Sequence, residues 1–247
     1  MLTQNVADGV HRIEDAYTNW YLVEGEGGLT IVDAGVPSSW RSLGEALRQL
    51  GRDGRDVEAL VLTHAHFDHI GFAERARSAL GIRVWVHEND VLLTRRPLQY
   101  GRERTPLAYL ATKPKALPMM ASLARSRAFF PKPIAEVERY TAESALDVPG
   151  RPEIVFTPGH TLGHCSLLLR DRGVVIAGDA LVTLNPYTGS RGPQIVARSA
   201  NADSERALLS LEALAATGAR VVLPGHGEPW RDGVEAAVEQ ARRTGIT

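Results

Sequence analysis

The stretch Thr63-His64-Ala65-His66-Phe67-Asp68-His69 decides how this chain is interpreted. It follows the apolar run 57–62 and precedes a helical pattern at 71–80. Residues i and i+2 at the end of a strand face the same way, so His64 and His66 can bind one ion. Asp68 and His69 lie where the chain turns, and they can point toward a second ion at the spacing that two-metal hydrolytic sites use. The stretch therefore predicts a two-metal site.

Three further residues that can bind metals stand in similar contexts, each directly after a glycine and shortly after an aliphatic run. They are His160 in Pro158-Gly159-His160-Thr161, Asp179 in Ala177-Gly178-Asp179-Ala180, and His226 in Pro224-Gly225-His226-Gly227. Functional residues gather on loops that a rigid scaffold holds in place, and these contexts fit that rule. We therefore expect four separate loops to contribute to one site.

These motifs resemble those of the metallo-β-lactamase-fold hydrolase superfamily, in its glyoxalase II-like and lactonase-like branch. They occur in order at 64–69, 157–164, 178–180 and 224–227, so the resemblance covers nearly the whole chain. The resemblance implies a first metal held by His64, His66 and His160, a second held by Asp68, His69 and His226, and a bridge between them formed by Asp179.

Composition sets the outer bounds. A chain of 247 residues with 44% apolar residues can bury one substantial core, and we expect a single domain over residues 1–247. The formal net charge of -1 gives no basis for binding nucleic acid or a membrane, because capture of phosphates requires a basic excess. The first residues lack the basic and apolar segments of a signal peptide, which predicts a cytoplasmic protein. We expect its partner to be a small-molecule substrate.

The pattern of apolar residues predicts two β-rich halves. In the first half we expect strands at 10–14, 20–24, 30–32, 57–62 and 82–87, with helices at 38–50 and 71–80. In the second half we expect a helix at 203–216, a strand at 219–223 and a final helix at 232–243. Such a chain belongs to the α/β class. The resemblance narrows it to a four-layer αββα sandwich, with two mixed β-sheets flanked by helices and the site at one edge between the sheets.

Residues 88–145 differ from the rest, because six of the fourteen prolines fall there. Proline cannot sit in a helix interior without losing a hydrogen bond, so Pro114, Pro118, Pro131 and Pro133 predict short helices, with candidates at 107–110 and 119–130. We interpret the segment as a helical cap insertion. Its apolar residues line a substrate pocket, form a homodimer contact or pack the cap onto the body; they are Leu107, Tyr109, Leu110, Met119, Met120, Leu123, Phe129 and Phe130.

The chemistry follows from the ions. Two divalent metals bridged by Asp179 and a water bring the pKa of that water toward neutrality, so a hydroxide is available without a protein nucleophile. Asp68 is the candidate to move a proton, because its second oxygen can face that water. Imidazole and carboxylate ligands suit zinc, although iron or manganese also accepts this set.

Supporting roles are assigned to fewer residues. Asp33 ends a strand and resembles the aspartate that supports a metal ligand in this family, with a turn aspartate as the alternative. Tyr187 and Arg191 follow Asp179 in a turn-rich loop and are the candidate substrate contacts. We interpret His164 as structural, and Cys165 as a small buried side chain.

Several reactions stay open. A small ester, thioester or lactone is the expected substrate. Some zinc β-lactamases of the superfamily bind zinc through a cysteine, and the motifs here contain no such cysteine, so β-lactam hydrolysis is disfavoured. The segment after His226 is short, which disfavours glutathione thioesters as substrates. The alternatives are a phosphodiesterase, a mononuclear iron sulfur dioxygenase of the same superfamily, and a non-catalytic ligand sensor.

Overall fold

Seven strands form one large sheet in chain order, and a computed structural model of the protein describes them together with every residue except 106–112, 143 and 145. Neighbouring strands are antiparallel from β1 to β4 and parallel from β4 to β7, so the sheet is mixed. The strands are β1 (Leu2–Ala7), β2 (Val10–Asp15), β3 (Thr18–Gly25), β4 (Gly28–Val32), β5 (Val57–Val61), β6 (Arg83–His87) and β7 (Glu138–Tyr140).

A second sheet has the order β13-β10-β9-β8 and is also mixed, because β10 pairs with β9 antiparallel and with β13 parallel. A separate two-stranded sheet joins β11 to β12. The strands are β8 (Glu153–Phe156), β9 (Cys165–Leu169), β10 (Val174–Gly178), β11 (Val182–Leu184), β12 (Arg191–Gln194) and β13 (Val221–Pro224).

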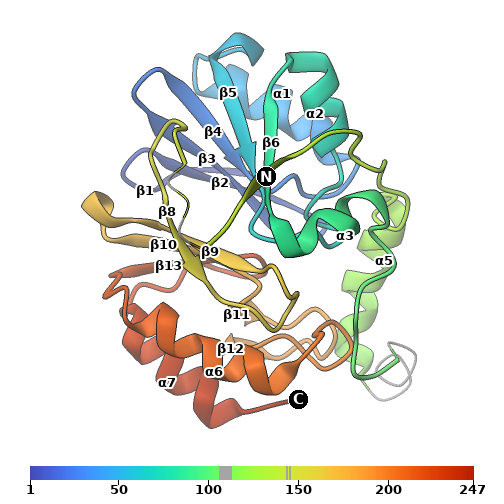
Figure 1. The fold of residues 1–247 in the computed structure, drawn as a ribbon. Coiled ribbons are helices and arrows are strands. Elements are labelled where there is room, and N and C mark those ends of the chain that lie inside the picture. Colours follow the sequence, from blue (N-terminus) through green and yellow to red (C-terminus); the bar gives the residue numbers. More distant parts are fainter. Residues whose placement is uncertain (106–112, 143, 145) are drawn as a thin grey trace.

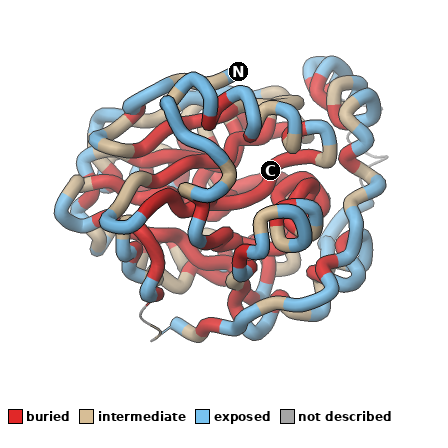
Figure 2. The backbone as a smooth tube through the Cα atoms, turned by 90° about the horizontal axis from the view of Figure 1, so that it is seen from above, coloured by how far each residue is buried: buried red, intermediate tan, exposed pale blue. Residues whose placement is uncertain are grey.

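The two larger sheets pack face to face. Tyr21 and Val61 of the first sheet share one buried cluster with Leu167 and Ile176 of the second. In addition, the hydroxyl of Tyr21 donates a 2.6 Å hydrogen bond to the carbonyl of Pro224 across the interface. Figure 2 shows this interior as buried backbone enclosed by exposed segments. Because side chains alternate along a strand, the other face of each sheet is left to pack against helices.

Helices cover these outer faces (Figure 1). Helices α1 (Ser39–Gln49) and α2 (Ala73–Leu80) pack on the first sheet, with Leu43 and Ala76 in the same cluster as Ile31. Helices α6 (Ser204–Ala215) and α7 (Val234–Thr244) pack on the second sheet, with Leu211 and Val238 in one cluster with β10 residues. The expected αββα sandwich is confirmed.

Residues 88–145 hold more than short helices. The described elements are η2 (Glu88–Asp90), α3 (Val91–Arg95), η3 (Pro114–Ala116), α5 (Leu117–Arg125) and strand β7. Pro114 and Pro118 lie in the first turns of η3 and α5, where proline is tolerated, so they begin helices and do not interrupt them. The helix expected at 107–110 lies outside the described residues.

The helix expected at 119–130 ends earlier, at Arg125. There the hydroxyl of Ser126 donates to the carbonyl of Ser122, and Arg127 adopts a positive φ of 61°, which turns the chain away. Helix α5 buries Met119 and Leu123 against the body, whereas Phe130 beyond it is 78% exposed. The dimer contact stays a prediction.

Short 3₁₀ turns at η1 (Gly54–Asp56) and η4 (Arg170–Arg172) complete the elements. None of the described helices is long and apolar enough to cross a bilayer.

Candidate metal centre

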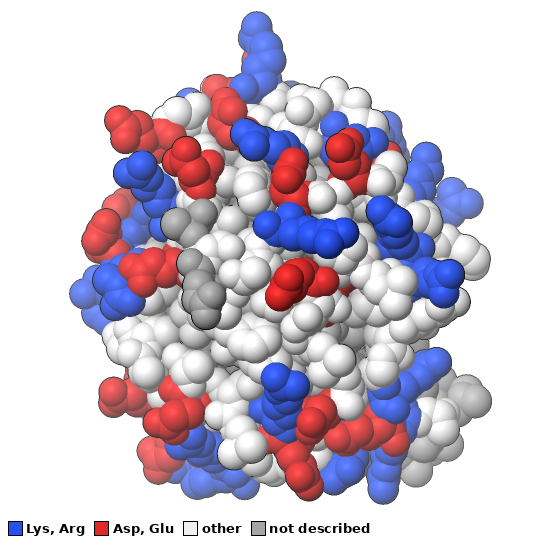
Figure 3. Space-filling view, viewed as in Figure 1, with Lys and Arg blue, Asp and Glu red and all other residues white. Residues whose placement is uncertain are grey.

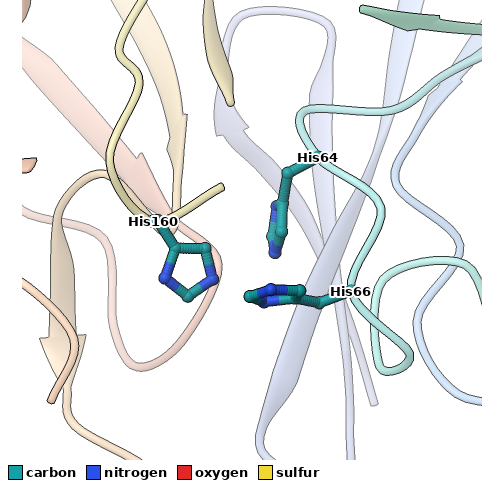
Figure 4. Close-up of side chains that lie close together, drawn as sticks. All are labelled: His64, His66 and His160. Carbon is teal, nitrogen blue, oxygen red and sulfur yellow. The ribbon is translucent and has the colours of Figure 1, made fainter. Parts of the chain in front are cut away.

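Two groups of three ligand-type side chains lie side by side at one edge of the sandwich. His64, His66 and His160 form the first group, and their ligand atoms lie within 4.8 Å of one another. Figure 4 shows the rings of His64 and His66, from one loop, converging with the ring of His160 from another. All three side chains are buried. The sequence motif at 64–69 and the motif at 157–164 therefore meet as expected.

The second group consists of Asp68, His69 and His226, again with ligand atoms within 4.8 Å of one another. Asp68 Oδ2 lies 3.5 Å from His226 Nε2 and 4.0 Å from His69 Nε2. Asp68 also accepts a 3.5 Å hydrogen bond from the hydroxyl of Thr18, at the start of β3.

Asp179 lies between the two groups. Its Oδ2 is 3.3 Å from Nε2 of His160 in the first group. The same oxygen is 3.2 Å from Nε2 of His226, and Oδ1 is 3.6 Å from Nε2 of His69, both in the second group. All seven residues that the sequence singled out as ligands thus meet in one place.

The unpaired atoms of this cluster test whether metal ions fit it. Some of its nitrogens and oxygens are buried without a hydrogen-bond partner, namely Nε2 of His64, His66, His69 and His160 and Oδ1 of Asp179. A buried polar atom left without a partner costs about 1–3 kcal/mol, so five in one cluster would be strongly unfavourable. Divalent ions would satisfy imidazole nitrogens and a carboxylate together, and the residues present fit such ions.

Asp33 supports both groups. Its Oδ2 lies 3.1 Å from His69 Nδ1 and accepts a 2.8 Å hydrogen bond from the hydroxyl of Thr63. The Thr63 oxygen in turn lies 3.0 Å from Nδ1 of His64. Because the Thr63 proton goes to Asp33, its oxygen is free to accept from His64. The Asp33 carboxylate therefore orients one imidazole in each group. The backbone of Asp33 itself lies in the left-handed region, at φ 60°.

Two further imidazole orientations, those of His160 and His226, are fixed from outside the motifs. His226 Nδ1 lies 2.7 Å from the carbonyl of Tyr17, in the β2–β3 turn, and a carbonyl can only accept. His160 Nδ1 lies 2.9 Å from Oδ1 of Asn201, whose amide nitrogen donates to the carbonyl of Val196. In both histidines the proton is therefore on Nδ1, which leaves Nε2 free to bind an ion.

The electrostatics differ between the groups. Burial, together with the neighbouring histidines, lowers the pKa of His64 and of His66 well below the usual range, so both rings are neutral, as ligands must be. Burial alone would also lower the pKa of His69, but Asp179, Asp68 and Asp33 together raise it to about 10. These carboxylates favour a positive charge at His69, which is the charge that a divalent ion supplies.

A carboxylate outside the motifs joins the two ligand loops of the first group. Asp90 accepts hydrogen bonds from the Ala65 backbone at 3.1 Å, the Thr161 hydroxyl at 2.7 Å and the Gly163 backbone at 2.8 Å. It is 1% exposed, and burial raises its pKa to about 6. Sequence reasoning missed Asp90, because nothing near it in the chain marks its partners.

Glycine precedes the ligand His226 for a steric reason. A Cβ atom on Gly225 would lie 2.0 Å from Asp179 Oδ1 and 3.0 Å from His69 Cε1. The Gly225 backbone cannot move aside easily, because its N–H donates to the Gly178 carbonyl and its own carbonyl accepts from Asn19. The Pro-Gly-His-Gly motif thus reflects close packing of the loop on the ligands.

His164 and Cys165 lie beside the centre without joining either group. The Nε2 atom of His164 accepts a 3.0 Å hydrogen bond from the backbone N–H of Asp179, and its Nδ1 lies 2.9 Å from the Thr157 hydroxyl. Cys165 is fully buried in the core between the sheets. Both positions fit the structural roles expected for them.

A small cavity opens onto the ligands. Its volume is about 20 Å³, and Tyr187 is among its lining residues. The hydroxyl of Tyr187 shares a hydrogen bond with that of Tyr100, whose ring centroid lies 4.3 Å from that of His66. Arg191 is exposed and is not among the lining residues, so its position does not support the expected substrate contact.

The αββα fold and the two groups of His and Asp side chains are those of a metallo-hydrolase. A sequence model described as the metallo-beta-lactamase superfamily matches residues 13–226, and the chain belongs to that superfamily. Among curated proteins, the chain is 28% identical over 239 residues to a probable metallo-hydrolase, YflN of Bacillus subtilis (strain 168), covering 90% of this chain and 85% of that protein.

Solved structures agree. A metallo-beta-lactamase family protein of Thermus thermophilus, TTHA1429, is 28% identical with a TM-score of 0.67, covering 94% of this chain and 78% of that one. The protein TTHA1623, solved in a di-iron-bound form, is 25% identical with a TM-score of 0.62, covering 91% and 95%.

Proposed function

We propose that this protein is a hydrolase that uses two divalent metal ions to cleave a small ester, thioester or lactone. The observation that supports this most is the position of Asp179. Its carboxylate lies within 3.3 Å of His160 in the first group and within 3.2 Å of His226 in the second. A carboxylate between two groups of ligands is suited to bridge two ions, and the remaining ligands are complete on both sides.

When bound, two divalent ions supply a water of lowered pKa as the nucleophile and a Lewis acid for the scissile carbonyl. The residues of the chain would do the rest. Asp68 is only 8% exposed and reaches the cavity, where it can accept the proton of the attacking water. Tyr187 lines the same cavity, and its hydroxyl could turn from Tyr100 to donate a hydrogen bond to the carbonyl oxygen as negative charge develops.

Zinc is the proposed metal, because three imidazoles with a carboxylate suit it. Iron is the main alternative, and the likeness to a protein solved in a di-iron-bound form supports that alternative as well as the two-metal proposal. Manganese would accept the same ligands.

Two other reactions fit less well. A mononuclear iron dioxygenase would not require the second group, which is complete here. A phosphodiesterase would be favoured by a basic approach to the site. Among the described residues that line the cavity, however, none is a lysine or an arginine, and the face of the molecule in Figure 3 carries acidic and basic side chains interspersed.

The test combines elemental analysis with a panel of esters, thioesters and lactones. We expect about two ions per chain and turnover of at least one class. Asp179→Ala should abolish turnover, whereas Asp147→Ala, which removes a carboxylate that is 99% exposed, should not. A single iron ion per chain would support the dioxygenase. A non-catalytic sensor would be supported if the unaltered protein showed no turnover and the Asp179→Ala variant still bound ligand.

A further inference from the structure

The walls of the cavity are uncharged except for the candidate ligands themselves. Five of the lining residues belong to the two metal groups or the bridge: His66, Asp68, His160, Asp179 and His226. The others present carbon surface or a phenol: Phe67, Met120, Leu123, Pro186, Tyr187, Val196 and Ala200. These come from the ligand loop, helix α5 and the segments that flank strands β11 and β12.

From this lining we infer that the part of the substrate away from the reacting carbonyl is neutral and apolar, and that it packs against helix α5 and Phe67. The inference rests on the proposed hydrolase function and narrows it to esters, thioesters or lactones with an uncharged acyl group.

Away from the ions that the candidate ligands would hold, the lining offers no cation to a charged substrate. Among the described residues that line the cavity, none is a lysine or an arginine. The segment 106–112 contains neither residue in its sequence. Arg102, on the Tyr100 side of the site, is exposed, and its guanidinium lies 5.5 Å from the ring centroid of Tyr100. An anionic group on this part of the substrate would lose its hydration without gaining a partner, which weakens binding.

The two acidic side chains of the lining do not change this. Asp68 and Asp179 would be taken up by the ions, so a charged group on the remote part of the substrate could find a partner only among the other lining residues, which are uncharged. A neutral acyl chain meets no such penalty, and its burial against Met120 and Leu123 would strengthen binding by about fourfold for each methylene group.

The cavity is too small for an acyl group, so some of its lining side chains must move when the substrate binds. A volume of about 20 Å³ holds roughly one water molecule, far below the roughly 300 Å³ or more that is typical of ligand pockets. Met120 is the side chain best suited to make room, because it is only partly buried and methionine is unbranched and flexible. Helix α5 would therefore adapt to the acyl group.

A matched pair of substrates tests the inference on the metal-loaded protein. 4-Nitrophenyl butyrate and mono-4-nitrophenyl glutarate share a leaving group, and only the second carries a terminal carboxylate. We expect kcat/KM for the neutral ester to be about 30-fold higher or more, which corresponds to the effect of one buried charge without a partner. Calorimetry with the corresponding amides, as slowly hydrolysed analogues, should give the same order of dissociation constants.

Two variants of one position locate the acyl group. Met120→Arg places a cation in the lining and should shift the ratio of the two kcat/KM values toward the carboxylate ester by about tenfold or more. Met120→Leu, which changes shape without charge, should keep the preference for the neutral ester. Circular dichroism and thermal unfolding show whether each variant is folded.

The outcomes distinguish the proposed hydrolase function from the proposed preference for a neutral acyl group. No turnover of any ester, thioester or lactone would refute the proposed function itself. Turnover with equal or better use of the glutarate ester would overturn the inference and leave the hydrolase standing. A preference for the neutral ester that a folded Met120→Arg variant leaves unchanged would overturn the placement against α5.

Discussion

Thr161 donates a 2.7 Å hydrogen bond to Asp90, and this contact joins the loop of His160 to the segment that follows strand β6. The same oxygen of Asp90 accepts from the backbone N–H of Ala65, which lies between His64 and His66. One buried carboxylate therefore holds the two loops of the first group at a fixed separation, although it is no candidate ligand itself.

Replacing Asp90 with asparagine should loosen that group. An amide offers one acceptor oxygen where the carboxylate offers two, so at least one backbone N–H loses its partner. We expect metal affinity at the first group to fall by about 10- to 100-fold and stability by about 1–3 kcal/mol. Zinc titration against a competing chelator measures the affinity. Asp171→Asn, at an exposed carboxylate, is the control, and unchanged affinity in Asp90→Asn would remove Asp90 from the support of the site.

A methyl group on Gly225 should disturb the bridge. Gly225→Ala would place Cβ 2.0 Å from Asp179 Oδ1, so the carboxylate must move. We expect lower metal content and lost turnover in protein that still folds. Gly44→Ala is the matched control, because nothing lies within 4 Å of its Cβ and the exposed helical position should gain about 0.5–1 kcal/mol. Full metal loading of Gly225→Ala would contradict the packing described here.

The thiol of Cys165 should be inert in the folded protein. Burial raises its pKa from 9.0 to about 12, and the side chain is fully buried. Ellman's reagent at about pH 8, below the ordinary thiol pKa, should label it only after unfolding in guanidinium chloride. Because the folded pKa lies above the unfolded value, stability should fall as pH rises from about 9 to 12. Rapid labelling of the native protein would instead indicate an accessible thiolate.

Metal loading should stabilise the fold. An ion that binds only the native state at a free concentration about 1,000 times its dissociation constant contributes about 4 kcal/mol. For a chain of this size, that corresponds to a rise of about 8–16 °C in Tm. Differential scanning calorimetry with and without zinc measures the shift. Magnesium is the control, because it prefers oxygen ligands and should change Tm little; equal shifts with both metals would count against the histidine groups as the binding site.

The ligand residues could be predicted because each motif is local. His64 and His66 are two residues apart, and a glycine stands directly before each of His160, Asp179 and His226. The residues that orient these ligands could not be predicted from the sequence. Asn201 lies 41 residues from His160, and the carbonyl of Tyr17 lies 209 residues from His226. Such contacts exist only after the sheets have packed.

The fold was predictable to a similar degree. The apolar pattern located β2 to β6, most of whose residues are buried, and the four outer helices, each of which buries one face. It missed β1, whose residues are mostly not buried, and β7, which has only three residues. Short or exposed strands are set by their pairing partners, which local sequence does not reveal.

Each of the two groups of candidate ligands combines residues from both halves of the chain. His64 and His66 need His160, and Asp68 and His69 need His226, which follows strand β13. A nascent chain that has not yet emerged past residue 226 would hold no complete second group. Metal acquisition during synthesis would therefore occur in two stages, with the second ion captured only after residue 226 has emerged.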